Sequence, residues 1–163
     1  MTQKAVLLLG TNIGNRKQNL EEAAMLVDRQ VSKLVERSSV YQTAAWGVED
    51  QEDFLNQVIT FNNELEPEEL LERILSIERR MGRERKEKWG PRLIDIDILF
   101  IGIEIIDTPA LKVPHPELQN RRFTLEPLNE LMPDFVHPKL GTTINILLAN
   151  CPDTLPVTLY TNE

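Results

Sequence analysis

Two aspartates interrupt an otherwise apolar run, IDIDILFIG. Side chains alternate between the faces of a strand, so Asp95 and Asp97 share one face, with Cα atoms roughly 6.5–7 Å apart. Two ionised carboxylates this close repel each other. Mg²⁺ removes the repulsion, because it binds one or two carboxylates together with phosphate oxygens and water, and two ions can bridge such a pair to a phosphate chain. The alternative, two acids on a solvated face, is disfavoured because Leu99 and Ile101 share that predicted face, whereas Phe100 faces the other way.

Basic residues gather just ahead of the acids. Seven of the 18 lysines and arginines lie between positions 79 and 92. Arg83, Arg85 and Arg92 are the strongest candidates, because the arginine fork binds phosphate oxygens bidentately. With Trp89 among them and glycines on both sides, the segment is typical of a cationic lid that closes over a phosphate chain. The alternative is a basic surface loop with Trp89 packed into the core.

A third group follows in the segment VPHPELQNRRF. His115 stands between two prolines, which hold the backbone extended, and Arg121 and Phe123 come soon after it. A histidine in such a loop is commonly structural, but the nearby arginine makes phosphate binding a second interpretation. The other histidine, His137, has no such neighbours, and we expect it at the surface.

A fourth group surrounds the loop between Thr43 and Asn56. An aromatic ring and an amide can hold a flat heterocycle by stacking and by hydrogen bonds to its edge. Phe54, Asn56 and the backbone near Ala44 therefore form a candidate heterocycle site. The alternative for Phe54 is a place in the core.

Composition limits the classes of function. The chain has 163 residues, 41% of them hydrophobic and 27% charged, with a net charge of −8. An acidic protein is poorly suited to bulk nucleic-acid binding, which depends on lysine and arginine contacts to phosphates. The longest early apolar run, residues 5–9, is too short to cross a membrane, and the lone Cys151 fits a reducing cytosol. We expect one domain, residues 1–163, that acts as a cytoplasmic monomer on small molecules.

The elements that must position these residues follow from periodicity and capping signals. Asn15 is a predicted N-cap for a helix that runs to about Asp28, and Pro67 and Gly82 bound a second helix. Strands are predicted at residues 5–9, 31–43, 54–65 and 93–101. This order predicts an α+β fold with a ferredoxin-like βαββαβ core, a mainly antiparallel sheet and both helices on one face. We expect a short hairpin at residues 102–106, and a C-terminal extension, residues 107–163, that wraps the core with short helices.

The four groups occur in order with other recognisable segments. They are LGTNIGNR, the Thr43 loop, FLN, RERKEKWGPRLIDIDIL, VPHP and RRFTLEPLNEL. Together they resemble the 6-hydroxymethyl-7,8-dihydropterin pyrophosphokinases of folate biosynthesis, over nearly the whole chain. The resemblance implies transfer of pyrophosphate from the co-substrate ATP to the hydroxymethyl group of the pterin, with release of AMP. It also implies that Asp95 and Asp97 hold two Mg²⁺ ions.

The resemblance also assigns individual residues. The implied ATP contacts are Glu78, Arg83, Arg85, Arg92, Ile98, His115 and Arg121. The implied pterin contacts are Thr43, Ala44, Trp46, Phe54, Asn56, Trp89, Asp95 and Phe123, with the two phenylalanine rings on either side of the pterin. The implied catalytic residues are Arg83, Arg85, Trp89, Arg92 and Asp97. Departures from members of the family at Ala44, Leu75, Ala110 and Lys112 are expected to alter affinities.

Three other functions remain open. A nucleotidyltransferase would use the same aspartates to pass AMP to an acceptor, and would release pyrophosphate instead of AMP. An RNA-binding module on a ferredoxin-like sheet is opposed by the acidic composition and the absence of an aromatic strand motif. A pterin-binding protein with only a regulatory role would not need Asp95, Asp97 and Arg92.

Overall fold

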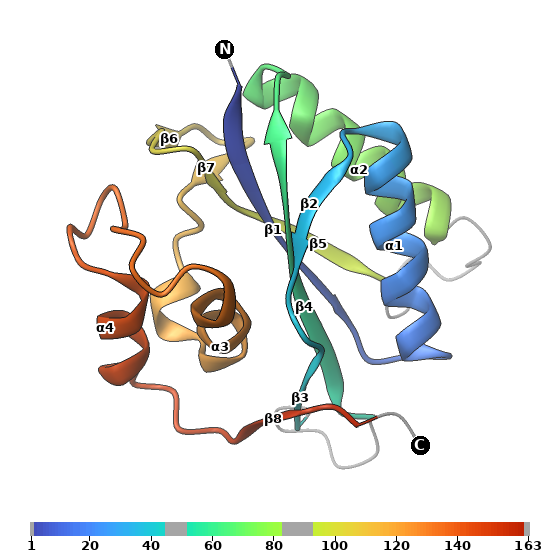
Figure 1. The fold of residues 1–163 in the computed structure, drawn as a ribbon. Helices are drawn as coiled ribbons and strands as arrows, with labels where there is room; N and C mark the ends of the chain where they lie inside the picture. Colours follow the sequence, from blue (N-terminus) through green and yellow to red (C-terminus); the bar gives the residue numbers. More distant parts are fainter. Residues whose placement is uncertain (1, 45–51, 83–92, 162–163) are drawn as a thin grey trace.

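The protein is described by a computed structural model that covers residues 2–44, 52–82 and 93–161. Its elements are β1 (Gln3–Thr11), α1 (Arg16–Gln30), β2 (Leu34–Arg37), β3 (Tyr41–Thr43), β4 (Phe54–Asn63), α2 (Pro67–Met81), β5 (Asp95–Ile101), β6 (Ile106–Asp107), β7 (Lys112–Val113), the 3₁₀ helix η1 (Leu118–Asn120), α3 (Arg122–Leu131), α4 (Ile144–Ala149) and β8 (Val157–Leu159) (Figure 1). Among these helices, none is long and apolar enough to cross a membrane.

One sheet forms the centre of the fold. Its strand order is β5-β1-β4-β3-β8, and β2 pairs with β4 as well. Every strand pair formed by the described residues is antiparallel. The central strand β1 lies between the third and fourth strands of the βαββαβ unit, as the ferredoxin-like order requires. The predicted α+β fold is therefore confirmed.

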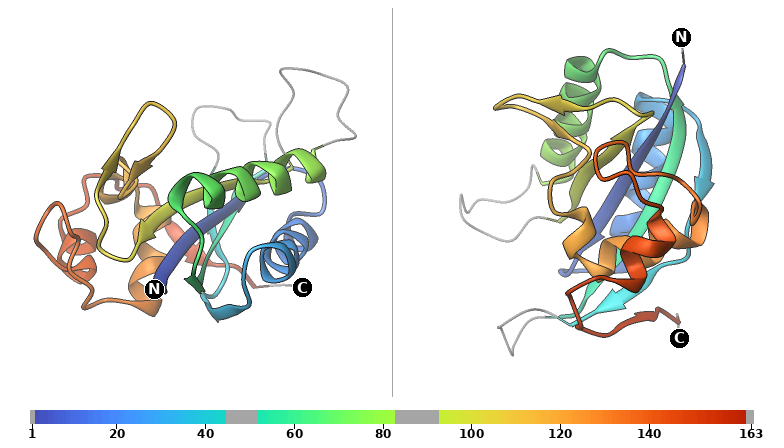
Figure 2. Two further views of the ribbon diagram at one scale, coloured as in Figure 1. Left: turned by 90° about the horizontal axis from the view of Figure 1, so that it is seen from above. Right: turned by 90° about the vertical axis from the view of Figure 1, so that its left-hand side faces the viewer.

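The sheet has a separate apolar core on each face. Leu7 and Leu9 of β1 point to the core beneath α1 and α2. Val6 and Leu8, which alternate with them, point to a second core beneath α3 and α4. Figure 2 shows the two pairs of helices on opposite sides of the sheet. The C-terminal extension thus covers the face that the first two helices leave free.

Local signals set the ends of the first two helices. The Asn15 side chain accepts a hydrogen bond from the backbone N–H of Gln18 at 3.1 Å, so the predicted N-cap is confirmed. Helix α1 continues to Gln30, two residues past the predicted end. In α2, Pro67 is in the first turn and Gly82 is the C-cap, as predicted.

The predicted strand 31–43 is wrong, because the chain forms β2 and β3 with a break between them. At Ser38 the backbone N–H donates to the Val58 carbonyl at 2.8 Å, and the hydroxyl accepts the Val58 N–H at 2.9 Å. A side chain thus takes the place of one backbone partner in the ladder. The register of β2 on β4 also shifts between Leu34 and Glu36. These features divide the segment into two short strands.

A bulge in β5 puts two of its residues on the opposite faces of the sheet from those predicted. Val6 pairs with Phe100 and Leu7 with Ile98, so one residue of β5 has no partner across the ladder. An extra residue in a strand reverses the alternation beyond it. Phe100 therefore joins the core on the α3 side, and Ile101 joins the core on the α1 side. Both were predicted on the opposite faces.

The C-terminal extension contains short helices, as predicted, and also adds β8 to the sheet. The hairpin after β5 lies later than predicted and is formed by β6 and β7. His137 was predicted at the surface, but it is only 2% exposed. Its Nδ1 accepts the backbone N–H groups of Lys139 and Leu140, and its ring contacts Phe100 edge to face at 5.5 Å. The ring is thus part of the structure of the extension.

Candidate active site

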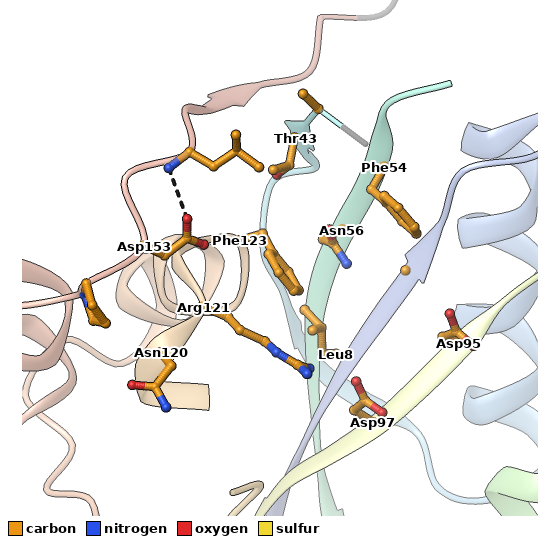
Figure 3. Close-up of a pocket in the computed structure, with 14 residues that line it drawn as sticks. Leu8, Thr43, Phe54, Asn56, Asp95, Asp97, Asn120, Arg121, Phe123 and Asp153 are labelled. Carbon is orange, nitrogen blue, oxygen red and sulfur yellow. Dashed lines mark hydrogen bonds between the residues drawn. The ribbon is translucent and has the colours of Figure 1, made fainter. Parts of the chain in front are cut away.

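A cavity of about 690 Å³ opens on the face of the sheet that carries α3. It lies between the ends of β1, β4 and β5 and the start of α3 (Figure 3). Its lining residues are Leu8, Gly10, Thr43, Ala44, Phe54, Asn56, Asp95, Asp97, Asn120, Arg121, Phe123, Pro152, Asp153 and Leu155. Eight of these were predicted from the sequence: Thr43, Ala44, Phe54, Asn56, Asp95, Asp97, Arg121 and Phe123.

The register of the sheet sets the floor of the cavity. Gly10 of β1 pairs with Asp95 of β5 on one side and with Asn56 of β4 on the other. Adjacent strands are about 4.8 Å apart, so the carboxylate and the amide start from backbones roughly 10 Å apart. The glycine between them has no side chain. The Asn56 amide reaches into this space, since a Cβ on Gly10 would stand 2.6 Å from its Nδ2. The floor therefore has an acidic end and an amide end.

The acidic end matches the donor set of a magnesium site. Asp95 is exposed and Asp97 is half-buried, and both side chains reach the cavity from β5. In the described part of the chain, no group of three or more histidine, cysteine, aspartate or glutamate residues is placed to hold a metal ion. A metal with mainly protein ligands is therefore not indicated there. Two carboxylates fit Mg²⁺, which takes its other ligands from phosphate and water.

Arg121 and His115 extend the cationic side of this region. The Arg121 side chain points into the cavity toward Asp97 in Figure 3, and its guanidinium lies 5.9 Å from the centre of the Phe123 ring. The backbone N–H of His115 donates to the Leu99 carbonyl of β5 at 3.1 Å, which places His115 beside the acidic strand.

The surroundings of His115 indicate which of its ring nitrogens carries a proton. Burial lowers its pKa below the usual 6.5; the negative charge of Asp97 opposes this shift, and the positive charge of Arg121 adds to it. Its Nδ1 accepts the N–H of Glu117 at 3.1 Å. A neutral imidazole that accepts at Nδ1 carries its proton on Nε2. His115 can thus donate one hydrogen bond to an anion.

The amide end suits a flat polar ring. Thr43 and Asn56 are each 4% exposed. Within the described residues, Thr43 Oγ1 and Asn56 Oδ1 are buried without a hydrogen-bond partner. Buried polar atoms are usually paired, and because these two belong to residues that line the cavity, they can accept hydrogen bonds from a ligand bound there. In Figure 3 the rings of Phe54 and Phe123 lie on either side of Asn56, where they can stack on such a ring.

Three predicted residues lie outside the cavity lining: His115, described above, Ile98 and Glu78. Ile98 is 6% exposed and packs in the core on the α1 side, so only its backbone on the edge strand can reach a ligand. The Glu78 carboxylate of α2 accepts the backbone N–H of Ile96 at 2.8 Å, between the two aspartates in sequence. Five other predicted residues lie outside the described part of the chain: Trp46, Arg83, Arg85, Trp89 and Arg92.

Six lining residues were missed from the sequence: Leu8, Gly10, Asn120, Pro152, Asp153 and Leu155. Gly10 had a signal, because a glycine inside an apolar strand often marks a close approach. A Cβ added there would be 2.6 Å from Asn56 Nδ2. Pro152, Asp153 and Leu155 had no local signal, because their place depends on how the C-terminal extension returns to the sheet.

Comparisons with known proteins agree on one family. The family described as 7,8-dihydro-6-hydroxymethylpterin-pyrophosphokinase (HPPK) matches residues 6–133. A 2-amino-4-hydroxy-6-hydroxymethyldihydropteridine pyrophosphokinase of Synechocystis is 42% identical over 156 residues, which are 94% of this chain and 80% of that protein. One of the same description from Aquifex aeolicus is 43% identical over 132 residues, 80% of this chain and 81% of that protein.

Solved structures show the same fold. The wild-type Plasmodium falciparum HPPK-DHPS, crystallised with pterin and p-hydroxybenzoate, superposes with a TM-score of 0.72 at 20% identity. The match covers 91% of this chain and 42% of that longer one. This chain therefore spans less than half of the Plasmodium protein.

Proposed function

Because this chain belongs to the 7,8-dihydro-6-hydroxymethylpterin-pyrophosphokinase family, we propose that it transfers pyrophosphate from ATP to 6-hydroxymethyl-7,8-dihydropterin in folate biosynthesis. The products are the pterin diphosphate and AMP. The observation that supports this most is the cross-strand row Asp95–Gly10–Asn56. It puts an end suited to metal and phosphate and an end suited to a heterocycle on the floor of one cavity.

The pterin binds at the amide end. The unpaired oxygens of Thr43 and Asn56 accept hydrogen bonds from the N–H groups at its edge, and Asn56 Nδ2 is a donor for its ring acceptors. The rings of Phe54 and Phe123 stack on its two faces. Ala44 and Trp46 belong to the same proposed pocket. Held this way, the bicycle directs its hydroxymethyl group over Gly10 toward the aspartates.

ATP binds at the acidic end. Asp95 and Asp97 are the proposed ligands of two Mg²⁺ ions, which supply charge neutralisation to the phosphate chain when bound. Arg121 and His115 donate to phosphate oxygens, and Glu78 and the backbone of Ile98 are the proposed contacts at the nucleotide end. The oxygen of the pterin hydroxyl attacks the β-phosphorus and its proton is released to solvent. The bond from that phosphorus to the α-phosphate bridging oxygen breaks, and AMP leaves with that oxygen. Catalysis is then largely positioning and charge stabilisation.

Four further residues are proposed to contact the phosphates and stabilise the transferred group: Arg83, Arg85, Trp89 and Arg92. We take residues 1–163 to act as one pyrophosphokinase domain. A monomeric state and a cytoplasmic location belong to the same proposal. The single cysteine, Cys151, which is free and buried, supports the reducing compartment.

The test is AMP release from Mg²⁺–ATP with and without 6-hydroxymethyl-7,8-dihydropterin. Pterin-dependent AMP together with equimolar pterin diphosphate is the expected result. Pyrophosphate in place of AMP would establish nucleotidyl transfer. Folded protein that binds pterin but forms neither product would establish a regulatory role and refute the proposed reaction.

A further inference from the structure

The start of helix α3 carries two proposed site residues but cannot be capped by its own N-cap side chain. Arg121 is the N-cap residue, and an arginine side chain has only donors. The first N–H groups of a helix have no partner within the helix and need an acceptor from outside it. The first turn of the helix, where Phe123 lies, therefore depends on an acceptor supplied by another part of the chain.

Asp153 supplies this acceptor, although it lies 31 residues beyond Arg122. Its Oδ2 accepts the backbone N–H of Arg122 at 3.1 Å, and its backbone carbonyl accepts Arg122 Nε at 2.9 Å. A carboxylate at this end of a helix also interacts favourably with the helix dipole. Asp153 is thus a long-range cap for α3.

The same carboxylate also fixes the segment that follows it. Its Oδ1 accepts the backbone N–H of Leu155 at 3.0 Å, the dashed line in Figure 3. Two residues later β8 begins, and its Val157 pairs with Thr43 of β3. Pro152, Asp153 and Leu155 also line the cavity. One side chain therefore joins the α3 wall of the cavity to the strand that carries Thr43.

We propose that Asp153 is a positioning residue that sets the separation between the Phe123 ring and the Thr43 edge, and thereby the affinity of the site for its flat heterocycle. This inference rests on the proposed function for the identity of the heterocycle. It concerns a segment outside the family match, which ends at residue 133. The nucleotide end depends less on Asp153. The backbone N–H of Arg121 donates to the Leu118 carbonyl of η1 at 3.3 Å, so η1 also holds Arg121 in place.

The test variant is Asp153→Asn, which keeps the shape but replaces one acceptor oxygen by a donor. It can accept only one of the two backbone N–H groups. We expect the KM for pterin to rise about tenfold and the KM for ATP to change by less than about twofold. An unchanged KM for pterin, or an equal rise in both, would overturn the inference.

Asp28→Ala is the control for stability, because Asp28 Oδ1 also accepts a backbone N–H, that of Leu34 at 2.8 Å, outside the cavity, and alanine removes this acceptor. It should lower the melting temperature without changing either KM. If Asp28→Ala raises the KM for pterin as much as Asp153→Asn, loss of stability explains both effects and the inference fails.

A second readout separates this inference from the proposed reaction. If the unsubstituted protein forms no AMP, the proposed function fails, and amide NMR of the free protein still tests Asp153. Loss of the carboxylate should move the Arg122 and Leu155 amide protons upfield and also shift the ring protons of Phe123. Unchanged Phe123 resonances would show that Asp153 does not position the ring.

Discussion

Gly10 offers the most direct single-methyl test of the site. A Cβ built on it would stand 2.6 Å from Nδ2 and 3.7 Å from Cγ of Asn56. Non-bonded carbon and nitrogen atoms prefer separations of about 3.5 Å, so Gly10→Ala must displace the amide by roughly 1 Å. The backbone of Gly10 is not in the left-handed region, so alanine adds no backbone strain. The perturbation is thereby confined to the side chain of Asn56.

The displacement has a cost that can be estimated. Asn56 is 4% exposed, and its Nδ2 donates to the Leu9 carbonyl at 3.4 Å, so the amide has little freedom to adapt. A misaligned amide leaves a buried polar group of the pterin unpaired, which costs about 1–3 kcal/mol. That range corresponds to a roughly 5- to 150-fold loss of affinity. Folding should change little, because alanine in a strand is favoured over glycine by roughly 0.5–1 kcal/mol, which offsets part of the strain.

The assay is calorimetric titration of pterin in the presence of a non-hydrolysable ATP analogue, with the melting temperature measured in parallel. The control is a double-mutant cycle with Asn56→Ala, which removes the colliding amide. In the Asn56→Ala protein, the added Gly10→Ala change should alter the affinity for pterin by less than about twofold. Wild-type affinity in Gly10→Ala, or an equal loss on both backgrounds, would refute the assignment of Asn56 to the pterin.

Three further changes test other parts of the site and fold. Asp97→Asn should lower the rate of AMP formation by roughly a hundredfold or more, because it weakens a proposed magnesium ligand, and a near-normal rate would contradict that role. Arg16→Gln should raise the KM for pterin, because the Arg16 guanidinium donates to the backbone carbonyl of Asp53 at 2.8 Å and so holds the residue before Phe54. A change in the KM for ATP alone would argue against this role. Burial lowers the pKa of His137 below 6.5. As the pH drops below about 6.5, His137 therefore takes up a proton in the unfolded chain before it does so in the native state, and the free energy of unfolding falls. His137→Gln should therefore make the melting temperature less dependent on pH between about 7 and 5, and an unaltered pH dependence would exclude His137 as a source.

Features controlled by nearby residues were predictable from the sequence. Asn15 caps a helix whose first turn contains its partner, Gln18, and the limits of α2 follow from Pro67 and Gly82. The period-2 pattern of β5 was also sufficient to place Asp95 and Asp97 on one face. In each case the residues that determine the feature lie within a few positions of it.

Features controlled by distant partners were not predictable in this way. The break at Ser38 depends on Val58, 20 residues later, whose N–H the Ser38 hydroxyl accepts. The faces of Phe100 and Ile101 depend on where β5 pairs with β1, because the bulge reverses their alternation. The burial of His137 depends in part on Phe100 of β5, which lies 37 residues earlier and contacts the His137 ring edge to face. None of these partners can be identified from spacing along the chain.

The position of the cavity follows from how far the C-terminal extension covers the sheet. Along β1, Val6 and Leu8 lie in the core on the α3 side, while Gly10, two residues on, lines the cavity floor. Along β4, Val58 is in the same core and Asn56 is in the cavity. On these two strands the change from apolar side chains to a polar or absent one occurs at the same level. On β5, Asp95 stands at that level and Asp97 stands opposite Leu8. Both carboxylates are tolerated because they face the cavity instead of a packed helix. The extension therefore stabilises the sheet face through α3 and α4, and its residues Pro152, Asp153 and Leu155 form one wall of the cavity in which the proposed reaction takes place.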